Sequence, residues 1–264
     1  MRAKTYVITG ASSGIGYALC CQLAQHNQKI IAIARRKDRL EQLQVLYPDH
    51  IEIISADLAK ESGRKHAVEV IGAQPIAGLV NNAGITGQVD YLENLSLKNW
   101  HELCAVNLDA PLFLTQALLP QFQKGSRIIN MTTGTTQFVL SGIAGYAMTK
   151  AALNVFTKYL SEELKPKGIF VTAAHPGIVE TELAADVPYH PNPRLGVVQA
   201  NQRLKAENKY LELPLSVKFL SWLLLKAENS LYTGDIIGVY NQKYQPLWHD
   251  RIIPSPYPAN VTPP

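Results

Sequence analysis

Tyr146 and Lys150 are the residues of this chain whose types and spacing most directly indicate chemistry. A separation of four residues places them on one face of a helix, one turn apart. A phenol ordinarily loses its proton at about pH 10, and a neighbouring ammonium favours the phenolate. The pair therefore predicts a proton donor to a developing oxyanion, and a base in the reverse direction. Taken alone the pattern is weak, because many amphipathic helices contain it.

Thr133 is the candidate for a second contact to the same oxygen. It lies thirteen residues before Tyr146, directly after a strand-like run, and its hydroxyl is positioned to donate a hydrogen bond. Ser141 lies closer to Tyr146 in the chain and is the alternative. His101 and Cys104 are three residues apart but have no further ligands, so no metal site is predicted.

The stretch TGASSGIG, residues 9–16, is the second chemical motif. Gly10 permits a tight turn from strand to helix, Gly14 lets the backbone approach a diphosphate, and Gly16 lets the helix lie close to the sheet. Ser12 and Ser13 supply hydroxyl donors, and the unpaired N–H groups that begin a helix attract negative charge. The spacing differs from G-x-G-x-x-G, but the physical requirements are the same. We therefore predict a dinucleotide site here, against the alternative of an ordinary glycine-rich turn.

Arg35 and Arg36 follow the second strand, where many NAD-binding proteins place a carboxylate for the ribose 2′-hydroxyl. Two guanidinium groups suit a 2′-phosphate through charge-assisted hydrogen bonds. The sequence therefore predicts NADP(H) as the preferred cofactor, with NAD(H) possible. Two solvated arginines at a strand end are the alternative interpretation.

Short apolar runs alternate with amphipathic segments along the chain. Runs that are almost continuously apolar indicate strands buried on both faces, as in a parallel sheet covered by helices. The predicted strands cover 4–9, 29–34, 51–55, 76–81, 126–132, 169–174 and 235–240. This alternation predicts an α/β fold: one doubly wound Rossmann-type domain with a mostly parallel sheet of about seven strands, flanked by helices.

Composition narrows the class of protein. The chain has 264 residues, 47% of them hydrophobic, and a net charge of +4 with no Lys/Arg block, so neither nucleic acid nor membrane is an expected partner. No apolar run reaches the roughly 18 residues of a membrane span, and the first strand begins too early for a signal peptide. Three cysteines make no paired framework, which indicates the cytoplasm.

Two regions interrupt the alternation. The long connection 180–213 is predicted to be a substrate loop or lid within a dinucleotide-binding and catalytic domain, 1–244. The Pro-rich tail 245–264 is predicted to be extended, either as a frayed end or as a cover for the site or a partner subunit.

The motifs, taken together and in order, resemble the short-chain dehydrogenase/reductase family in its single-domain form of ordinary length. TGASSGIG is followed by NNAG at 81–84, Asn107 and YAMTK at 146–150, and HPGIVET at 175–181 is similar to the family's P-G-x-x-x-T segment. The resemblance covers about residues 4–241 and implies an NAD(P)-dependent oxidoreductase. It departs at Thr133, where the family usually has serine.

The resemblance also implies residue roles. Tyr146 would be the general acid and base, Lys150 would hold the nicotinamide ribose and lower the pKa of the phenol, and Asn107 would bend its helix and position a water. Asn81 would lie near the adenosine ribose, and Thr181 near the carboxamide. The full set of cofactor-binding residues would be Gly10, Ser12, Ser13, Gly14, Ile15, Gly16, Arg35, Arg36, Asp57, Leu58, Asn81, Ala83, Gly84, Tyr146, Lys150, Pro176, Gly177, Ile178 and Thr181.

The predicted substrate is a small carbonyl compound that is reduced to an alcohol. Apolar residues follow the fifth and sixth predicted strands and favour a hydrophobic or dicarbonyl ketone; they are Phe138, Val139, Leu140, Ile143, Leu183, Val187, Pro188 and Tyr189. A weaker similarity to sepiapterin and benzil reductases agrees with this choice. The family resemblance further implies a homodimer or homotetramer paired through helices at 100–119 and 145–164. The alternatives are an NADP-binding scaffold without turnover and a non-redox epimerase or dehydratase.

Overall fold

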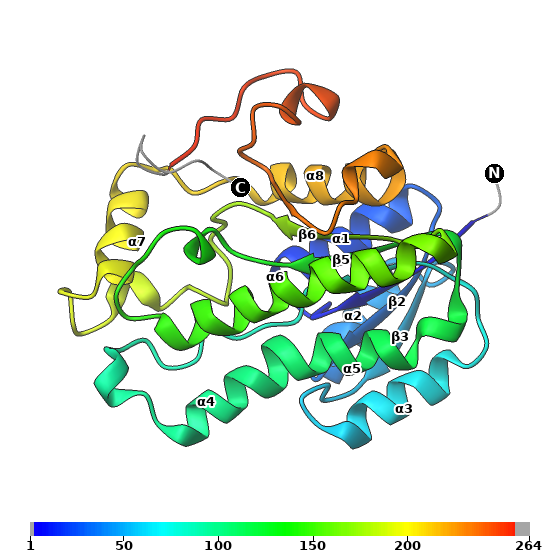
Figure 1. The fold of residues 1–264 in the computed structure, drawn as a ribbon, viewed down its shortest axis with the longest axis horizontal. Coiled ribbons are helices and arrows are strands. Elements are labelled where there is room, and N and C mark those ends of the chain that lie inside the picture. Colours follow the sequence, from blue (N-terminus) through cyan, green and yellow to red (C-terminus); the bar gives the residue numbers. More distant parts are fainter. Residues whose placement is uncertain (1–2, 257–264) are drawn as a thin grey trace.

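A sheet of seven strands runs through the centre of the molecule, and the computed structural model describes residues 3–256 of the chain. The strands are β1 (Thr5–Thr9), β2 (Lys29–Ala34), β3 (Ile51–Ser55), β4 (Ile76–Asn81), β5 (Phe122–Met131), β6 (Phe170–His175) and β7 (Ile236–Gly238). Their order across the sheet is β3-β2-β1-β4-β5-β6-β7, and every neighbouring pair is parallel. Figure 1 labels β2, β3, β5 and β6 among them. The predicted doubly wound α/β fold is confirmed.

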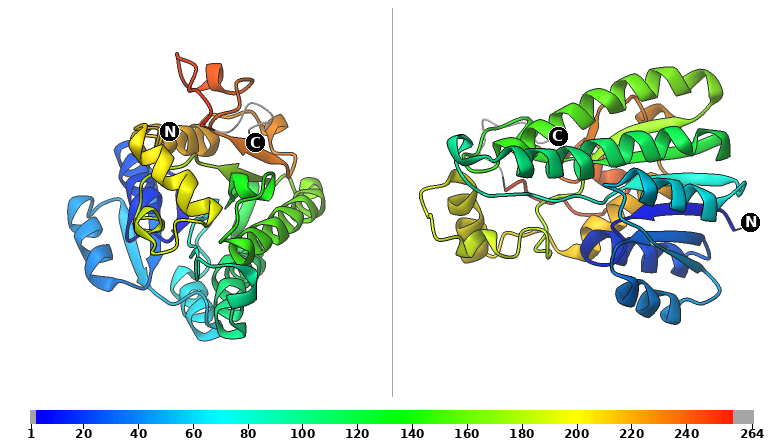
Figure 2. Two further views of the ribbon diagram at one scale, coloured as in Figure 1. Left: turned by 90° about the vertical axis from the view of Figure 1, so that its left-hand side faces the viewer. Right: turned by 90° about the horizontal axis from the view of Figure 1, so that it is seen from below.

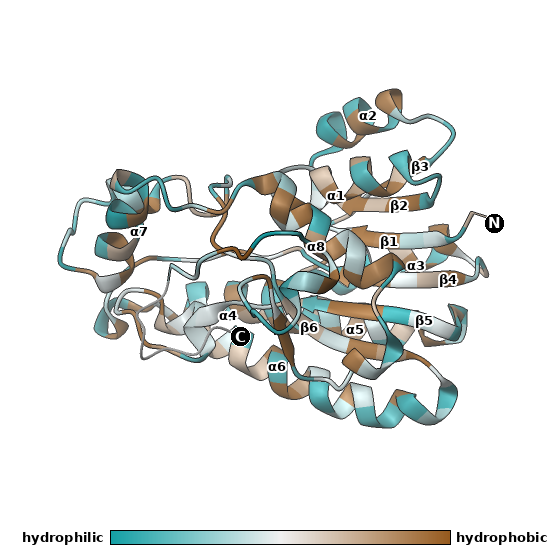
Figure 3. Cartoon of the chain, turned by 90° about the horizontal axis from the view of Figure 1, so that it is seen from above, coloured by the Kyte–Doolittle hydropathy of each residue, from teal (hydrophilic) through white to brown (hydrophobic). Residues whose placement is uncertain are grey.

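Helices cover both faces of this sheet (Figure 2). One layer contains α1 (Gly14–Gln25), α2 (Lys37–Leu46) and α8 (Leu213–Leu225); the other contains α3 (Glu61–Ile71), α5 (Ala110–Ala117) and α6 (Ala144–Leu164). Tyr6 and Ile8 of β1 point into the first core, while Val7 between them points into the second. Both faces of the strand are therefore buried, which explains its continuous apolar sequence. Helix α8 is hydrophobic along most of its length, as Figure 3 shows.

Helix α4 (Leu97–Cys104) is joined to α5 through a π-helical turn, Ala105–Asp109. Asn107 lies in this turn and is fully buried. A π-turn often marks a functional position, because it re-aims side chains within a continuous helix. The expected irregularity at Asn107 is thus present.

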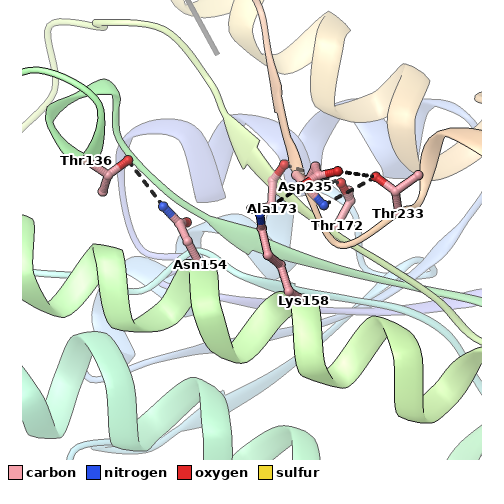
Figure 4. Close-up of polar contacts among 7 residues, drawn as sticks. All are labelled: Thr136, Asn154, Lys158, Thr172, Ala173, Thr233 and Asp235. Atoms are coloured by element: carbon pink, nitrogen blue, oxygen red, sulfur yellow. Dashed lines mark hydrogen bonds and ion pairs between the residues drawn. The ribbon is translucent and has the colours of Figure 1, made fainter.

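A hydrogen bond and an ion pair hold α6 to neighbouring segments (Figure 4). Asn154 donates to the Thr136 hydroxyl at 3.2 Å, in the segment that follows β5. Lys158 pairs with Asp235, which precedes β7, at 3.0 Å. The helix that carries Tyr146 and Lys150 is therefore held to the segments next to β5 and β7.

The segment that follows β7 packs against the body of the protein. The Gln245 side chain is buried and hydrogen-bonds Val239 on one side and Ile253 on the other. Trp248 lies against Phe219 of α8, with ring centroids 5.3 Å apart. Gln245, Trp248 and Ile253 are therefore buried against the body of the protein, so the start of the predicted tail is packed rather than frayed. The last predicted tail residues, 257–264, lie outside the described range.

Within residues 3–256, no helix combines the length and the apolar character that crossing a membrane requires.

Candidate active site

The glycine turn joins β1 to α1 at the carboxyl edge of the sheet. Gly10 has a φ of +67°, and a Cβ there would lie 2.8 Å from Asn82 Nδ2. A Cβ on Gly16 would lie 2.4 Å from the carbonyl oxygen of Gly10. Neither position has room for a side chain, so the predicted reasons for Gly10 and Gly16 are met.

The start of this turn is bonded to the end of β4. Thr9 Oγ1 accepts the N–H groups of Asn82 and Ala83, each at 3.0 Å, and the Asn82 amide donates to Thr9 O at 2.9 Å. Strands β1 and β4 are neighbours whose connections leave in opposite directions, which is the switch point where doubly wound sheets bind ligands. These hydrogen bonds therefore hold the glycine turn and the segment after β4 together at one crevice.

A cleft of about 360 Å³ opens at this switch point. Predicted cofactor residues supply much of its lining: Gly10, Ser12, Ser13, Gly14, Ile15, Arg35, Arg36, Asp57, Leu58, Ala83, Gly84 and Thr181. The other lining residues are Ile33, Ala34, Ala56, Ala59, Asn82, Ile85, Val106, Ala110, Glu182 and Leu183. Glycines that exclude side chains, the N-terminus of α1 and two arginines make this cleft fit an anionic dinucleotide.

Some predicted cofactor residues lie outside the cleft. The Asn81 side chain is buried and donates to Asn130 Oδ1 at 2.8 Å and Thr115 Oγ1 at 3.1 Å, so it does not line the cleft. Its place near the adenosine ribose stays a prediction. Its neighbour Asn82 lines the cleft instead.

The segment Pro176–Ile178 also lies outside the cleft lining. Ile178 donates its N–H to Tyr240 Oη at 3.2 Å, and its carbonyl accepts from Leu211 N at 2.8 Å. Tyr240 and Leu211, both later in the chain, therefore hold this segment in place. Thr181 lines the cleft and lies next to Gly14.

Arg36 connects the two sides of the cleft. Its guanidinium donates to Ser12 Oγ at 3.2 Å, to Ser13 Oγ at 2.7 Å and to Glu182 Oε2 at 2.7 Å. Arg35 also lines the cleft and is exposed. The predicted pair of arginines is thus at the expected place, and Glu182 is an anionic neighbour that sequence analysis missed.

Tyr146 and Lys150 lie on α6, near the end of β5. Burial raises the pKa of the Tyr146 phenol to about 12, and a hydrogen bond with Thr133 partly opposes this increase. Burial also lowers the pKa of the Lys150 ammonium to about 8. The ammonium lies 6.0 Å from the centre of the Tyr146 ring and donates to Met131 O at 2.9 Å. Burial and Thr133 account for the shift of the phenol pKa here, so its lowering by Lys150 stays a prediction.

Gly84 connects this pair to the cleft. A Cβ on Gly84 would lie 3.3 Å from Asn107 Oδ1 and 3.6 Å from Lys150 Nζ. Asn107 itself bonds Ile85 through both of its amide atoms, each at 2.9 Å, and donates to Thr149 Oγ1 at 3.1 Å. Three predicted residues from separate elements therefore meet at the edge of the cleft.

The structure distinguishes between the two hydroxyl candidates. The Thr133 hydroxyl accepts the Thr135 N–H at 3.3 Å and is the neighbour that lowers the pKa of the Tyr146 phenol. Ser141 is exposed and accepts the Gly196 N–H of α7 at 2.8 Å. Thr133 is thus the hydroxyl next to the predicted proton donor, and Ser141 holds the helix α7 (Gly196–Ala206) in place.

Part of the connection 180–213 packs with residues 140–146 and Val89 in a third, small hydrophobic cluster. We call it the lid cluster; its members are Ile143, Val187, Leu195, Val197 and Val198, with Tyr146, Leu140, Val89 and Ala184 packed against them. Of the predicted pocket residues, Leu140, Ile143 and Val187 belong to or contact this cluster. Val139 is 95% exposed and Tyr189 is also exposed, so these two do not line an enclosed pocket.

Comparisons with known proteins agree with this geometry. Residues 4–191 match the family model described as short chain dehydrogenase. A short chain dehydrogenase of Pseudocercospora fijiensis is 31% identical over 228 residues, covering 81% of this chain and 70% of the relative. Serine 3-dehydrogenase of Agrobacterium fabrum is 33% identical over 182 residues, covering 67% and 73%.

A solved structure has the same fold. It is a short chain dehydrogenase/reductase from Saccharomyces cerevisiae with a TM-score of 0.84 and 23% identity, covering 91% of this chain and 98% of that one.

Proposed function

Since this chain belongs to the short-chain dehydrogenase/reductase family of oxidoreductases, we propose that it reduces a small, hydrophobic carbonyl compound to an alcohol with NADPH. The observation that carries the proposal is the meeting of Asn107, Lys150 and Gly84 at the edge of the cleft, with the Tyr146 ring 6.0 Å from Lys150 Nζ on α6. When bound in the cleft, the dinucleotide supplies the hydride that adds to the carbonyl carbon.

The protein's own groups handle the proton. Tyr146 has a pKa of about 12, so its hydroxyl is protonated at neutral pH and donates to the oxygen that gains charge. The Thr133 hydroxyl, the neighbour that lowers the phenol pKa, donates its one proton to that oxygen in a second hydrogen bond. Lys150, with a pKa of about 8, is largely protonated at pH 7 and stabilises the phenolate left behind.

The substrate class follows from what surrounds Tyr146. The lid cluster packs against its ring with valine, leucine and isoleucine side chains. Apolar walls around one proton donor favour a hydrophobic ketone or dicarbonyl over a sugar or a phosphoester.

NADPH oxidation against a panel of diketones, quinones, pterins and keto acids tests the activity. Tyr146→Phe should lower turnover by roughly 10²–10⁴-fold while nucleotide binding is retained, because only proton transfer is removed. Tyr47→Phe is the matched control, since Tyr47 caps α2 and contacts Gln25, outside the cleft lining.

Two outcomes would contradict the proposed activity. Nucleotide binding without oxidation across the whole panel would indicate a scaffold. A product at the substrate's own oxidation state, with the nucleotide recycled, would indicate a non-redox enzyme.

The preference for NADPH rests on Arg35 and Arg36, which supply positive charge to the cleft. An Arg35→Ala/Arg36→Ala double variant should lose this preference, because the 2′-phosphate then lacks its charged donors. Equal use of NADH and NADPH by the wild type, or an unchanged preference in the double variant, would contradict it.

We also propose that α6 pairs with a second copy of the chain in a homodimer or homotetramer. Met148 and Val155 are exposed apolar residues on this helix, and Phe113 is exposed on α5. Val155→Glu should shift the mass measured by light scattering toward the monomer, and a wild type that is monomeric at micromolar concentration would contradict the proposal.

A further inference from the structure

The two walls of the dinucleotide cleft are joined by one ion pair. Ser12 and Ser13 belong to the glycine turn, Arg36 follows β2, and Glu182 follows β6. All four residues line the same cleft. The Arg36 guanidinium donates to both serines and, at 2.7 Å, to the Glu182 carboxylate, so it is turned toward the segment after β6.

Glu182 carries a full negative charge at neutral pH. The hydrogen bond and charge of Arg36, a hydrogen bond from Ser13 and the charge of Arg39 all lower the pKa of its carboxyl group. The pair is also open to water, since the side chains of Arg36 and Glu182 are 43% and 54% exposed. An exposed pair is weak and screened by salt, so an incoming anion can displace it.

We propose that Glu182 sets the nucleotide selectivity of the cleft by competing with the adenosine 2′-phosphate for Arg36. This inference rests on the proposed function, because it requires that the cleft binds an adenine dinucleotide. A 2′-phosphate must displace the Glu182 carboxylate from Arg36, and it then remains close to that carboxylate. Nucleotides without that phosphate do not make this exchange, so Glu182 reduces the advantage of NADP(H) over NAD(H).

The expected size of the effect follows from the exposure of the pair. Exposed ion pairs account for a few-fold in an equilibrium constant, and repulsion from a dianionic phosphate adds to this. We expect Glu182→Gln, which keeps the side-chain length and removes the charge, to raise selectivity for the 2′-phosphate about three- to tenfold at low salt.

Glu180 provides a matched control two residues earlier in the same segment. It pairs with Lys205 at 3.1 Å, with side chains 59% and 41% exposed, and it is not among the cleft-lining residues. Glu180→Gln removes the same charge from a similar pair, so it should leave nucleotide selectivity unchanged.

The test is calorimetric titration of 2′,5′-ADP and 5′-AMP, which differ only in the 2′-phosphate. The ratio of their affinities should rise about three- to tenfold in Glu182→Gln and in Glu182→Ala, and the rise should shrink at high salt. In an Arg36→Ala background, Glu182→Gln should have a smaller effect, because the competition for Arg36 is gone and only the repulsion between the carboxylate and the phosphate is removed.

An unchanged or lower ratio in both Glu182 variants, or an equal rise in Glu180→Gln, would overturn the inference. If the wild type binds 2′,5′-ADP more weakly than 5′-AMP, the proposed NADPH preference is contradicted. The change in this affinity ratio between the wild type and the Glu182 variants still tests the inference. Failure of every protein to bind either nucleotide would overturn both.

Discussion

Replacing Asn107 by alanine tests how strongly the π-helical turn is tied to the chain that leaves β4. Asn107 Oδ1 accepts the Ile85 N–H and Nδ2 donates to the Ile85 carbonyl, both at 2.9 Å, and Nδ2 also donates to Thr149 Oγ1 at 3.1 Å. The side chain is wholly buried, so water does not replace it easily. The alanine variant leaves both backbone groups of Ile85 without these partners.

The magnitude follows from those two groups. A buried donor or acceptor that loses its partner costs about 1–3 kcal/mol, and the two Ile85 hydrogen bonds are part-buried, so the free energy of unfolding should fall by about 2–4 kcal/mol. Because single domains are stable by only about 5–15 kcal/mol, this is a large fraction of the total. Ile85 lines the cleft, so affinity for 2′,5′-ADP should fall as well.

Asn154→Ala is the matched control for this experiment. Asn154 gives up only one hydrogen bond, at 3.2 Å to Thr136, and its Oδ1 has no hydrogen-bond partner in the described part of the chain. Its removal should cost about 1 kcal/mol or less. Urea denaturation followed by circular dichroism at pH 7 measures both variants. A loss below about 1 kcal/mol for Asn107→Ala, or one no larger than that of Asn154→Ala, would refute the reasoning.

Three further predictions follow from buried groups. The rate of carbonyl reduction should fall above about pH 8, where Lys150 loses its proton, and a kcat/KM profile that stays flat to about pH 9.5 would contradict this. Burial lowers the pKa of His175 to about 4 from 6.5, so this residue's contribution to stability is lost as the pH falls between those values, by about 3 kcal/mol in all. The free energy of unfolding of His175→Gln, measured by urea titrations at pH 7 and 5, should therefore fall less between these pH values than that of the wild type. An equal fall in both proteins would count against this prediction. Gly16→Ala should lose about 1–3 kcal/mol of stability and weaken nucleotide binding, because the new Cβ would collide with the Gly10 carbonyl; calorimetry showing wild-type affinity would exclude that collision.

The central fold could be predicted because buried parallel strands need apolar residues on both faces. Tyr6, Val7 and Ile8 divide between the two cores, and this division produces the continuous run that the sequence displays. Strand β5 begins at Phe122, four residues earlier than predicted. Its polar start, FQKGS, is held by backbone pairing such as Gly125 N to Gly168 O, which leaves no trace in hydropathy.

The cleft could be predicted in part because glycine and arginine are required there by geometry and charge. Asn81 and Asn82 show the limit of that reasoning. Side chains of consecutive strand residues point to opposite sides. Asn81 is buried and Asn82 lines the cleft, so an error of one residue in the predicted end of β4 assigns the wrong asparagine to the cleft.

Glu182 and the packed segment after β7 could not be predicted for a different reason. The Arg36 partner of Glu182 lies 146 residues away in the chain, and no local pattern reports such a contact. The segment from Gln245 to Ile253 has few strand or helix signals, and one buried glutamine side chain satisfies the backbone groups that secondary structure would otherwise pair.

The support of Ile178 by Tyr240 has a consequence for how this protein matures. The two residues are 62 positions apart, and Tyr240 belongs to a segment fixed by Gln245 still further along the chain. The glycine turn, β4 and α6 all leave the ribosome earlier. We therefore expect the loop after β6 to gain its final shape only once this later segment has emerged and docked, so that a stalled nascent chain containing Tyr146 still lacks the support of Ile178.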